Sequence, residues 1–157
     1  MSETVRILII DDDENIRSVL KAILEDEGYI VESVDTAKKG IEKSEKAFYN
    51  LALIDVRLPD MEGIELLAKM RDTKPKMRKI IITGYPTLQN AVAAVNKGAD
   101  AYVMKPFDVE KILQTIREQV KKQKEEKSFS EEKVAEFIET RVKELEALDE
   151  IKVKKRV

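Results

Sequence analysis

The sequence predicts an α/β fold, a doubly wound five-stranded parallel sheet with helices on both faces, plus a C-terminal helix. Two observations predict this fold. Five short apolar runs alternate along the chain with five stretches whose apolar residues recur at spacings of three and four. Consecutive apolar residues are typical of strands buried on both faces, which is the situation of a parallel sheet between two helical layers.

The apolar runs and the stretches between them define the predicted elements in chain order. The predicted strands are residues 5–10, 29–34, 51–54, 79–82 and 101–104. The predicted helices are residues 16–24, 37–47, 64–70, 88–95 and 109–120. Each helical stretch is short enough to cross one face of the sheet, and strands joined by helical crossovers pair in parallel.

Polar residues follow four of the predicted strands directly. Asp11 and Asp12 come after the first strand, Asp55 after the third, Thr83 after the fourth and Lys105 after the fifth. In a doubly wound sheet, ligands bind outside the carboxyl ends of the strands, near the point where the strand order reverses. We therefore expect these five side chains to share one site.

The residue types at these strand ends indicate phosphoryl transfer. Carboxylates held close together repel one another unless a cation neutralises them or a pKa rises. Oxygen ligands without histidine or cysteine favour Mg²⁺, and Lys105 and Thr83 could bind phosphoryl oxygens beside the metal. Asp55 is the best candidate for the nucleophile, because it lies between the acidic pair and the threonine and lysine.

Each of these residues also has an ordinary structural interpretation when it is taken alone. Asp11 and Asp12 also fit solvated loop acids, Asp55 also fits a residue that caps or bends the chain, and Lys105 also fits a surface lysine. We expect Asp13 to be the N-cap of the first helix, since aspartate accepts hydrogen bonds from the first amides of a helix. The convergence of the other residues on strand ends favours a shared site.

Composition excludes several other classes of site. The 157 residues, 43% of them apolar, are enough for one domain with an appendage. The chain has no cysteine and no histidine, which excludes a thiolate nucleophile, a zinc–thiolate site and a phosphohistidine within it. A net charge of −2 argues against general nucleic-acid affinity. Without a leader-like start or a long apolar segment, we expect a cytoplasmic protein with no membrane contact.

The composition changes after Pro106. All five glycines and all four prolines lie at or before this residue, and residues 121–157 hold 11 basic and 10 acidic side chains. We therefore predict a domain at residues 1–123 and a charged helical extension at 124–157. Ser128 and Glu131 form a candidate capping box, which predicts that a separate helix starts near Ser130.

The predicted extension carries an apolar stripe at helical spacing. Its members are Val134, Phe137, Ile138, Val142, Leu145 and Leu148. Three interpretations stay open at this point. The extension could pack on its own domain, mediate self-association or partner binding, or remain a disordered charged tail.

With these motifs in view, the chain resembles the receiver domain of two-component response regulators. The motifs that carry the resemblance are residues 7–13, 53–63, 82–85 and 101–107, and together they extend from about residue 5 to residue 120. The resemblance implies a flavodoxin-like fold and a stand-alone receiver with a helical C-terminal extension.

The resemblance also implies a phosphoacceptor and a metal site. Asp55 would take a phosphoryl group from a histidine of a partner kinase or phosphotransfer protein. Asp12 and Asp55 would bind Mg²⁺ together with the backbone carbonyl of Arg57, and Asp11 would act directly or through water. Arg57 and Tyr85 occupy positions that tune the lifetime of the phosphate in this family.

Three further residues would bind or sense the phosphoryl group. Lys105 would pair with it and Thr83 would hydrogen-bond to it. Tyr102 matches the family's switch aromatic, which turns inward when the threonine moves, although a half-buried strand tyrosine with a solvated hydroxyl is the ordinary alternative. The peptide bond between Lys105 and Pro106 is expected to be cis.

The implied function is that of a signalling receiver rather than an enzyme. It would change conformation on phosphorylation and signal to a protein partner, with a homodimer through the fourth and fifth helices or through the C-terminal helix. Direct DNA binding is not expected, because the residues after Lys121 are too few for the usual DNA-binding domains and their charges balance.

Other functions stay as alternatives. The chain could be a phosphorelay intermediate without its own output, or an interaction domain that is not phosphorylated. An aspartate-based phosphohydrolase would need a second carboxylate two residues after the nucleophile, where this chain has Arg57. External phosphatase activity is therefore disfavoured.

Overall fold

A computed structural model describes residues 4–84 and 86–156, with side chains as far as residue 149. The chain divides into two compact units, residues 1–123 and 124–157. The first unit is a five-stranded parallel sheet with helices on both faces, so the predicted fold class is confirmed.

All ten predicted elements are present, with ends that differ by a few residues except in the last helix. The strands are β1 (Arg6–Ile10), β2 (Ile30–Val34), β3 (Leu51–Asp55), β4 (Arg78–Thr83) and β5 (Ala101–Met104). The helices are α1 (Glu14–Asp26), α2 (Ala37–Lys46), α3 (Gly63–Lys69), α4 (Leu88–Asn96) and α5 (Val109–Arg156).

The strand order in the sheet is β2-β1-β3-β4-β5, with every neighbouring pair parallel. Strand order reverses at β1, because the chain first adds β2 on one side and then β3, β4 and β5 on the other. The carboxyl ends of β1 and β3 therefore lie next to each other at the switch point, where ligands bind in sheets of this kind.

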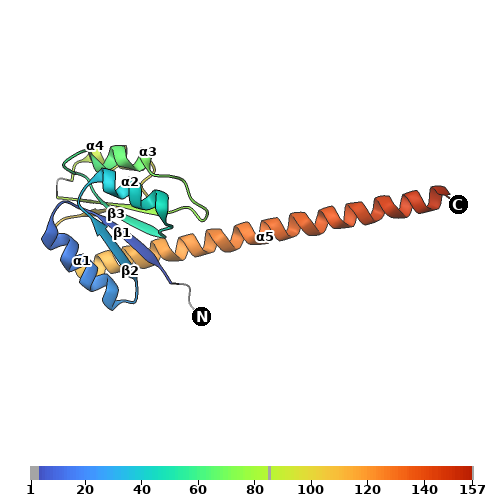
Figure 1. Ribbon diagram of the computed structural model, residues 1–157, viewed down its shortest axis with the longest axis horizontal. Helices are drawn as coiled ribbons and strands as arrows, with labels where there is room; N and C mark the ends of the chain where they lie inside the picture. Colours follow the sequence, from blue (N-terminus) through green and yellow to red (C-terminus); the bar gives the residue numbers. More distant parts are fainter. Residues whose placement is uncertain (1–3, 85, 157) are drawn as a thin grey trace. The chain divides into compact units, whose positions relative to one another are not determined.

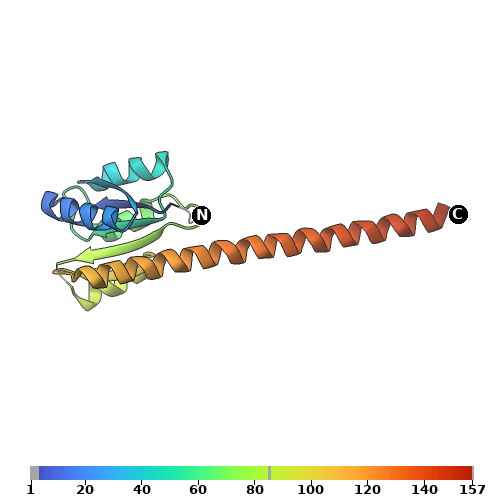
Figure 2. The same cartoon turned by 90° about the horizontal axis from the view of Figure 1, so that it is seen from below.

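Helices lie on both faces of the sheet (Figure 1), and an apolar core lies between the sheet and the helices on each face. Helix α1 and the first turns of α5 pack on one face, where Ile7 and Ile9 of β1 point. Helices α2, α3 and α4 cover the other face, where Leu8 and Ile10 point. Figure 2, seen from below, looks onto the α1 side. Successive side chains of a strand point to opposite faces of the sheet, and both faces are buried here. Consecutive residues are therefore apolar, which explains why the apolar runs are continuous in the sequence.

Side-chain caps position two of the loops at the carboxyl edge. Asp13 is the N-cap of α1, as predicted, and its carboxylate accepts from the amides of Asn15 and Ile16. Asp60, in the loop after β3, accepts from the amides of Ala37 and Lys38 at 2.9 Å each. The loop that follows Asp55 is thereby tied to the N-terminus of α2.

The prediction of a separate helix near Ser130 is wrong, since α5 runs without interruption from Val109 to Arg156. A capping box needs a break before its serine, and no glycine or proline follows Pro106 to provide one. The intervening lysine, glutamate and glutamine residues are good helix formers, so the helix continues. The assignment of residues 124–157 as a distinct extension stays a prediction.

Among the described residues, no helix has the length and apolar character needed to cross a membrane.

Candidate functional site

Three carboxylates gather at the switch point. Asp11 and Asp12 follow β1 and Asp55 ends β3, and one oxygen from each lies within 4.8 Å of the others. Asp11 and Asp55 are buried, whereas Asp12 is exposed. The sequence therefore predicted correctly that these acids are close together, although it gave no indication of how buried each one is.

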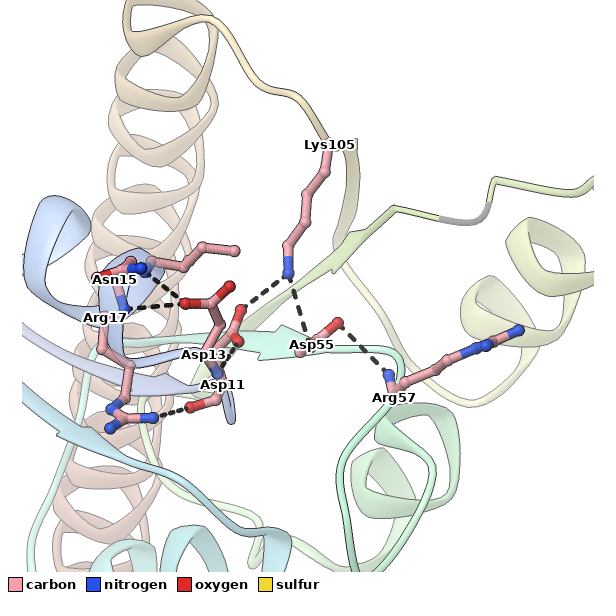
Figure 3. Close-up of polar contacts among 8 residues, drawn as sticks. Asp11, Asp13, Asn15, Arg17, Asp55, Arg57 and Lys105 are labelled. Atoms are coloured by element: carbon pink, nitrogen blue, oxygen red, sulfur yellow. Dashed lines mark hydrogen bonds and ion pairs between the residues drawn. The ribbon is translucent and has the colours of Figure 1, made fainter.

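Lys105 lies between two of these carboxylates (Figure 3). Its Nζ is 3.0 Å from Oδ2 of Asp11 and 3.6 Å from Oδ2 of Asp55. Its backbone N–H donates to the carbonyl of Thr83 at 2.6 Å, so the end of β4 holds the start of the loop after β5. The Lys105–Pro106 peptide is cis, as the resemblance implied. One ammonium is thus placed against two of the three carboxylates.

Backbone and side-chain bonds hold Asp11 in place. Its Oδ1 accepts from the amide of Asp13 at 2.9 Å, and its own amide donates to the carbonyl of Val34 at 3.1 Å. The guanidinium of Arg17 donates to the Asp11 carbonyl at 2.8 Å. Sequence reasoning missed Arg17, because nothing in its position on α1 indicates that its side chain returns to the preceding loop.

Asp55 is electrostatically strained. Burial raises the pKa of its carboxyl to about 6, and the charge of Asp11 adds to the rise. The Lys105 ammonium and the backbone N–H of Arg57, which lies 3.4 Å from Oδ1, oppose this rise only in part. The ionised form is therefore under-compensated by the protein alone, which is the condition in which a bound cation stabilises a carboxylate.

Gly63, at the start of α3, closes the loop after β3 over Asp55. Its N–H donates to the carbonyl of Val56 at 2.7 Å, and a Cβ on it would lie 2.1 Å from the backbone oxygen of Asp55. Between these residues, Arg57 and Glu62 form an antiparallel bridge, while the Arg57 side chain extends away from Asp55 (Figure 3). The sequence analysis did not identify Gly63 as a site residue. Its position at the start of a predicted helix was the only sign in the sequence.

Thr83 and Tyr102 lie on the two strands beside this cluster. Thr83 is fully buried at the end of β4. Tyr102 pairs with Ile81 across the sheet, and its hydroxyl is buried with no hydrogen-bond partner among the residues that the structure describes. This contradicts the alternative of a solvated hydroxyl. Tyr85, which was expected to influence phosphate lifetime, lies outside the described residues.

The donor set fits a hard divalent cation. Three carboxylates within coordinating reach of one another supply anionic oxygen ligands, which Mg²⁺ and Ca²⁺ prefer. One lysine cannot compensate three negative charges, and burial, together with the charge of Asp11, raises the pKa of Asp55. Two of the acids are buried at the ends of the strands, whereas Asp12 is exposed to solvent.

Comparisons with known proteins agree with this arrangement. Residues 7–117 match the family described as response regulator receiver domain. A receiver domain protein from Methanospirillum hungatei JF-1, described as CheY-like, is 50% identical, with a TM-score of 0.75 over 79% of this chain and 99% of that one.

Two further relatives extend the comparison. The transcriptional regulatory protein YkoG of Bacillus subtilis is 36% identical over 73% of this chain, which spans 50% of its length. A response regulator from Burkholderia pseudomallei, solved with a phosphorylated aspartic acid, calcium ion and citrate, is 28% identical. Its TM-score is 0.66, over 80% of this chain and 74% of that one. The chain belongs to the receiver domain family of two-component response regulators.

Proposed function

We propose that this receiver accepts a phosphoryl group on Asp55 from a histidine of a partner kinase or phosphotransfer protein, with Mg²⁺ as cofactor. The observation that carries the proposal is the position of the Lys105 ammonium against both Asp11 and Asp55, beside a third carboxylate. The Burkholderia relative, which holds a phosphorylated aspartic acid and a calcium ion, supports it.

The chemistry is a displacement at phosphorus. A carboxylate oxygen of Asp55 would attack the phosphorus of the donor phosphohistidine, the P–O bond would form, and the P–N bond would break with its electron pair returning to the imidazole. Asp55 is mostly ionised at neutral pH, because its pKa of about 6 lies below 7. The nucleophile therefore needs no general base, which suits a chain without histidine.

The surrounding residues would bind the transferred group. Lys105 would exchange its contact with Asp55 for one with a phosphoryl oxygen, and the hydroxyl of Thr83 would donate to another. Asp11, Asp12, Asp55 and the backbone carbonyl of Arg57 would hold Mg²⁺. When bound, the metal supplies positive charge that offsets the carboxylates and the phosphoryl oxygens.

Tyr102 provides a route by which phosphorylation could change the outer surface. A buried hydroxyl without a partner costs roughly 1–3 kcal/mol, so its present position is not strongly favoured. A shift of Thr83 toward a phosphoryl group would alter the packing of this neighbouring strand, and the Tyr102 ring, which is half-buried, would turn further inward. Phosphorylation would then bias an existing equilibrium between two conformations, which a protein partner reads.

The alternatives have less support. The position of a general acid in aspartate-based phosphohydrolases is taken by Arg57, whose side chain extends away from Asp55. Residues 109–156 form one helix, whereas a helix-turn-helix needs two, so we propose a protein target rather than DNA for this segment. A relay role without an output of its own uses the same site chemistry.

Phosphoryl uptake tests the proposed function. Incubation with a small phosphodonor and Mg²⁺ should add one phosphoryl group per chain, measured by intact mass. Asp55→Asn preserves shape but removes the nucleophile, so uptake should be lost. Asp60→Asn is the matched control, because Asp60 lies in the same loop but caps α2. Equal uptake by Asp55→Asn and the wild type would refute the assignment.

Metal affinity tests the role of Asp12. Asp12→Ala should weaken Mg²⁺ binding roughly tenfold or more, because the site loses an anionic ligand. Asp13→Asn is the control, since this neighbouring acid caps α1 and lies outside the carboxylate cluster. Calorimetric titration measures both variants, and unchanged affinity in Asp12→Ala would remove it from the proposed ligands.

A further inference from the structure

Within residues 124–149, helix α5 carries an exposed apolar stripe. Its six members are each between 46% and 71% exposed: Val134, Phe137, Ile138, Val142, Leu145 and Leu148. Helical periodicity places them on one face, whereas Phe129, which is 59% exposed, lies on a different side of the helix. A continuous exposed apolar surface of this size is typical of a contact site.

The spacing along this stripe matches a coiled-coil seam. Val134, Ile138, Arg141, Leu145 and Leu148 follow one another at alternating steps of four and three, which is the repeat that keeps one face toward a partner helix. Arg141 is the single polar member of this seam, and its guanidinium pairs with Glu144 at 3.0 Å. Four of five seam positions are therefore large and apolar.

We propose that the stripe pairs with the same stripe of a second copy of this chain, as a parallel, in-register dimer. Each stripe offers roughly 600 Å² of apolar side-chain surface, so that two stripes would bury roughly 1,200 Å², the lower end of specific interfaces. A parallel pair would bring the two copies of Lys124, where the second unit begins, to the same end. The proposal does not depend on phosphorylation.

Charge along the edges of the stripe selects the orientation. Glu146 and Glu139 flank it on one edge, and Glu139 pairs with Lys143 at 3.3 Å. The other edge carries Lys133, whose ammonium lies over the Phe129 ring, and Glu144, which pairs with Arg141. In a parallel dimer, unlike edges of the two helices meet, so the acidic edge faces the edge with the lysine. In an antiparallel dimer, the same edge of each helix meets, so the acidic edge of one copy would face the acidic edge of the other.

The oligomer mass tests the proposal. Light scattering on the full chain should give the mass of two copies. The double variant Ile138→Ala and Leu145→Ala should raise the dissociation constant roughly 100-fold or more, because it removes central apolar contacts. Alanine is the best helix former, so the helix itself is preserved. Phe129→Ala is the matched control for the oligomer mass, because it removes an exposed apolar side chain outside the stripe, with only the Lys133 ammonium over its ring affected. It should remain dimeric.

A wild-type mass of one chain would overturn the proposal, and so would a double variant that stays dimeric. Orientation is tested with Val134→Cys and Leu148→Cys, each made alone, since the chain has no other cysteine. In a parallel, in-register pair both positions face their own copies, so both variants should form disulfide-linked dimers on mild oxidation. An antiparallel pair can link at most one of them, and that result would refute the parallel arrangement.

Discussion

Replacement of Gly63 by alanine is expected to destabilise the domain by about 3 kcal/mol or more. An added Cβ would lie 2.1 Å from the backbone oxygen of Asp55 and 2.9 Å from its carbonyl carbon. These are backbone atoms of a central strand, so the clash cannot be relieved by a side-chain rotation. Either α3 moves away from β3 or Asp55 is displaced.

The same substitution should impair phosphoryl uptake, because Asp55 and the adjacent loop supply the proposed nucleophile and a metal ligand. The better helix propensity of alanine offsets about 1 kcal/mol at most. Chemical denaturation measures the stability change, and intact mass measures the uptake.

Gly84→Ala is the matched control at the same edge of the sheet. The nearest atoms to its added Cβ are carbons of the Lys105 side chain, at 3.9 Å and 4.0 Å, which is ordinary van der Waals contact. This variant should keep nearly wild-type stability. If Gly63→Ala and Gly84→Ala melted at the same temperature, the close approach of α3 to Asp55 would be wrong.

Asp55→Asn is expected to stabilise the metal-free protein at neutral pH. Burial and the Asp11 charge raise the pKa of Asp55 to about 6 in the folded state. The folded state therefore binds a proton more tightly than the unfolded state, and stability falls as pH rises from about 4 to about 6. Asparagine has no such charge. Above pH 6, the free energy of unfolding of the variant should therefore exceed that of the wild type by up to about 2 to 3 kcal/mol.

The sign of this effect makes it a stringent test. In a chelator-containing buffer, the stability difference between Asp55→Asn and the wild type should grow between pH 4 and pH 7. Added Mg²⁺ should reduce the difference, because the metal would stabilise the ionised wild-type site. A stability difference that does not change with pH would show that the pKa of Asp55 is not raised in the folded protein.

Asp60→Asn is a control that should change stability in the direction opposite to Asp55→Asn. Hydrogen bonds from the amides of Lys38 and Ala37 lower the pKa of Asp60, so its charge favours the folded state. This contribution to stability is present above the pKa that Asp60 has in the unfolded chain, and it is lost as the pH falls through the pKa that Asp60 has in the folded protein. Asp60→Asn should therefore reduce stability at neutral pH and have less effect in acid.

The amino-acid pattern was sufficient to predict the five strands, the first four helices and the meeting of the carboxylates. Strand β3, Leu51–Asp55, is buried at every residue, and its first four residues are apolar because they lie inside a parallel sheet. Parallel strands end at one edge, and residues that follow them, such as Asp11 and Lys105, must therefore come together there. The roles of these residues stay proposals.

Local signals were less reliable within the long helix α5. Ser128 and Glu131 have the spacing of a capping box, yet both lie inside the continuous helix α5. Such a box begins a helix only where the preceding residues are not helical. Neither glycine nor proline separates these residues from Val109, so nothing ends the helix.

The contacts that hold the site could not be predicted from the amino-acid pattern. The approach of Gly63 to the Asp55 carbonyl, the bond from Arg17 to Asp11 and the raised pKa of Asp55 depend on distances between separate elements. Sequence periodicity specifies which face of an element is buried, but it does not specify how closely two elements approach. That approach results from packing of the whole core, which sets burial and therefore the charge state of the site.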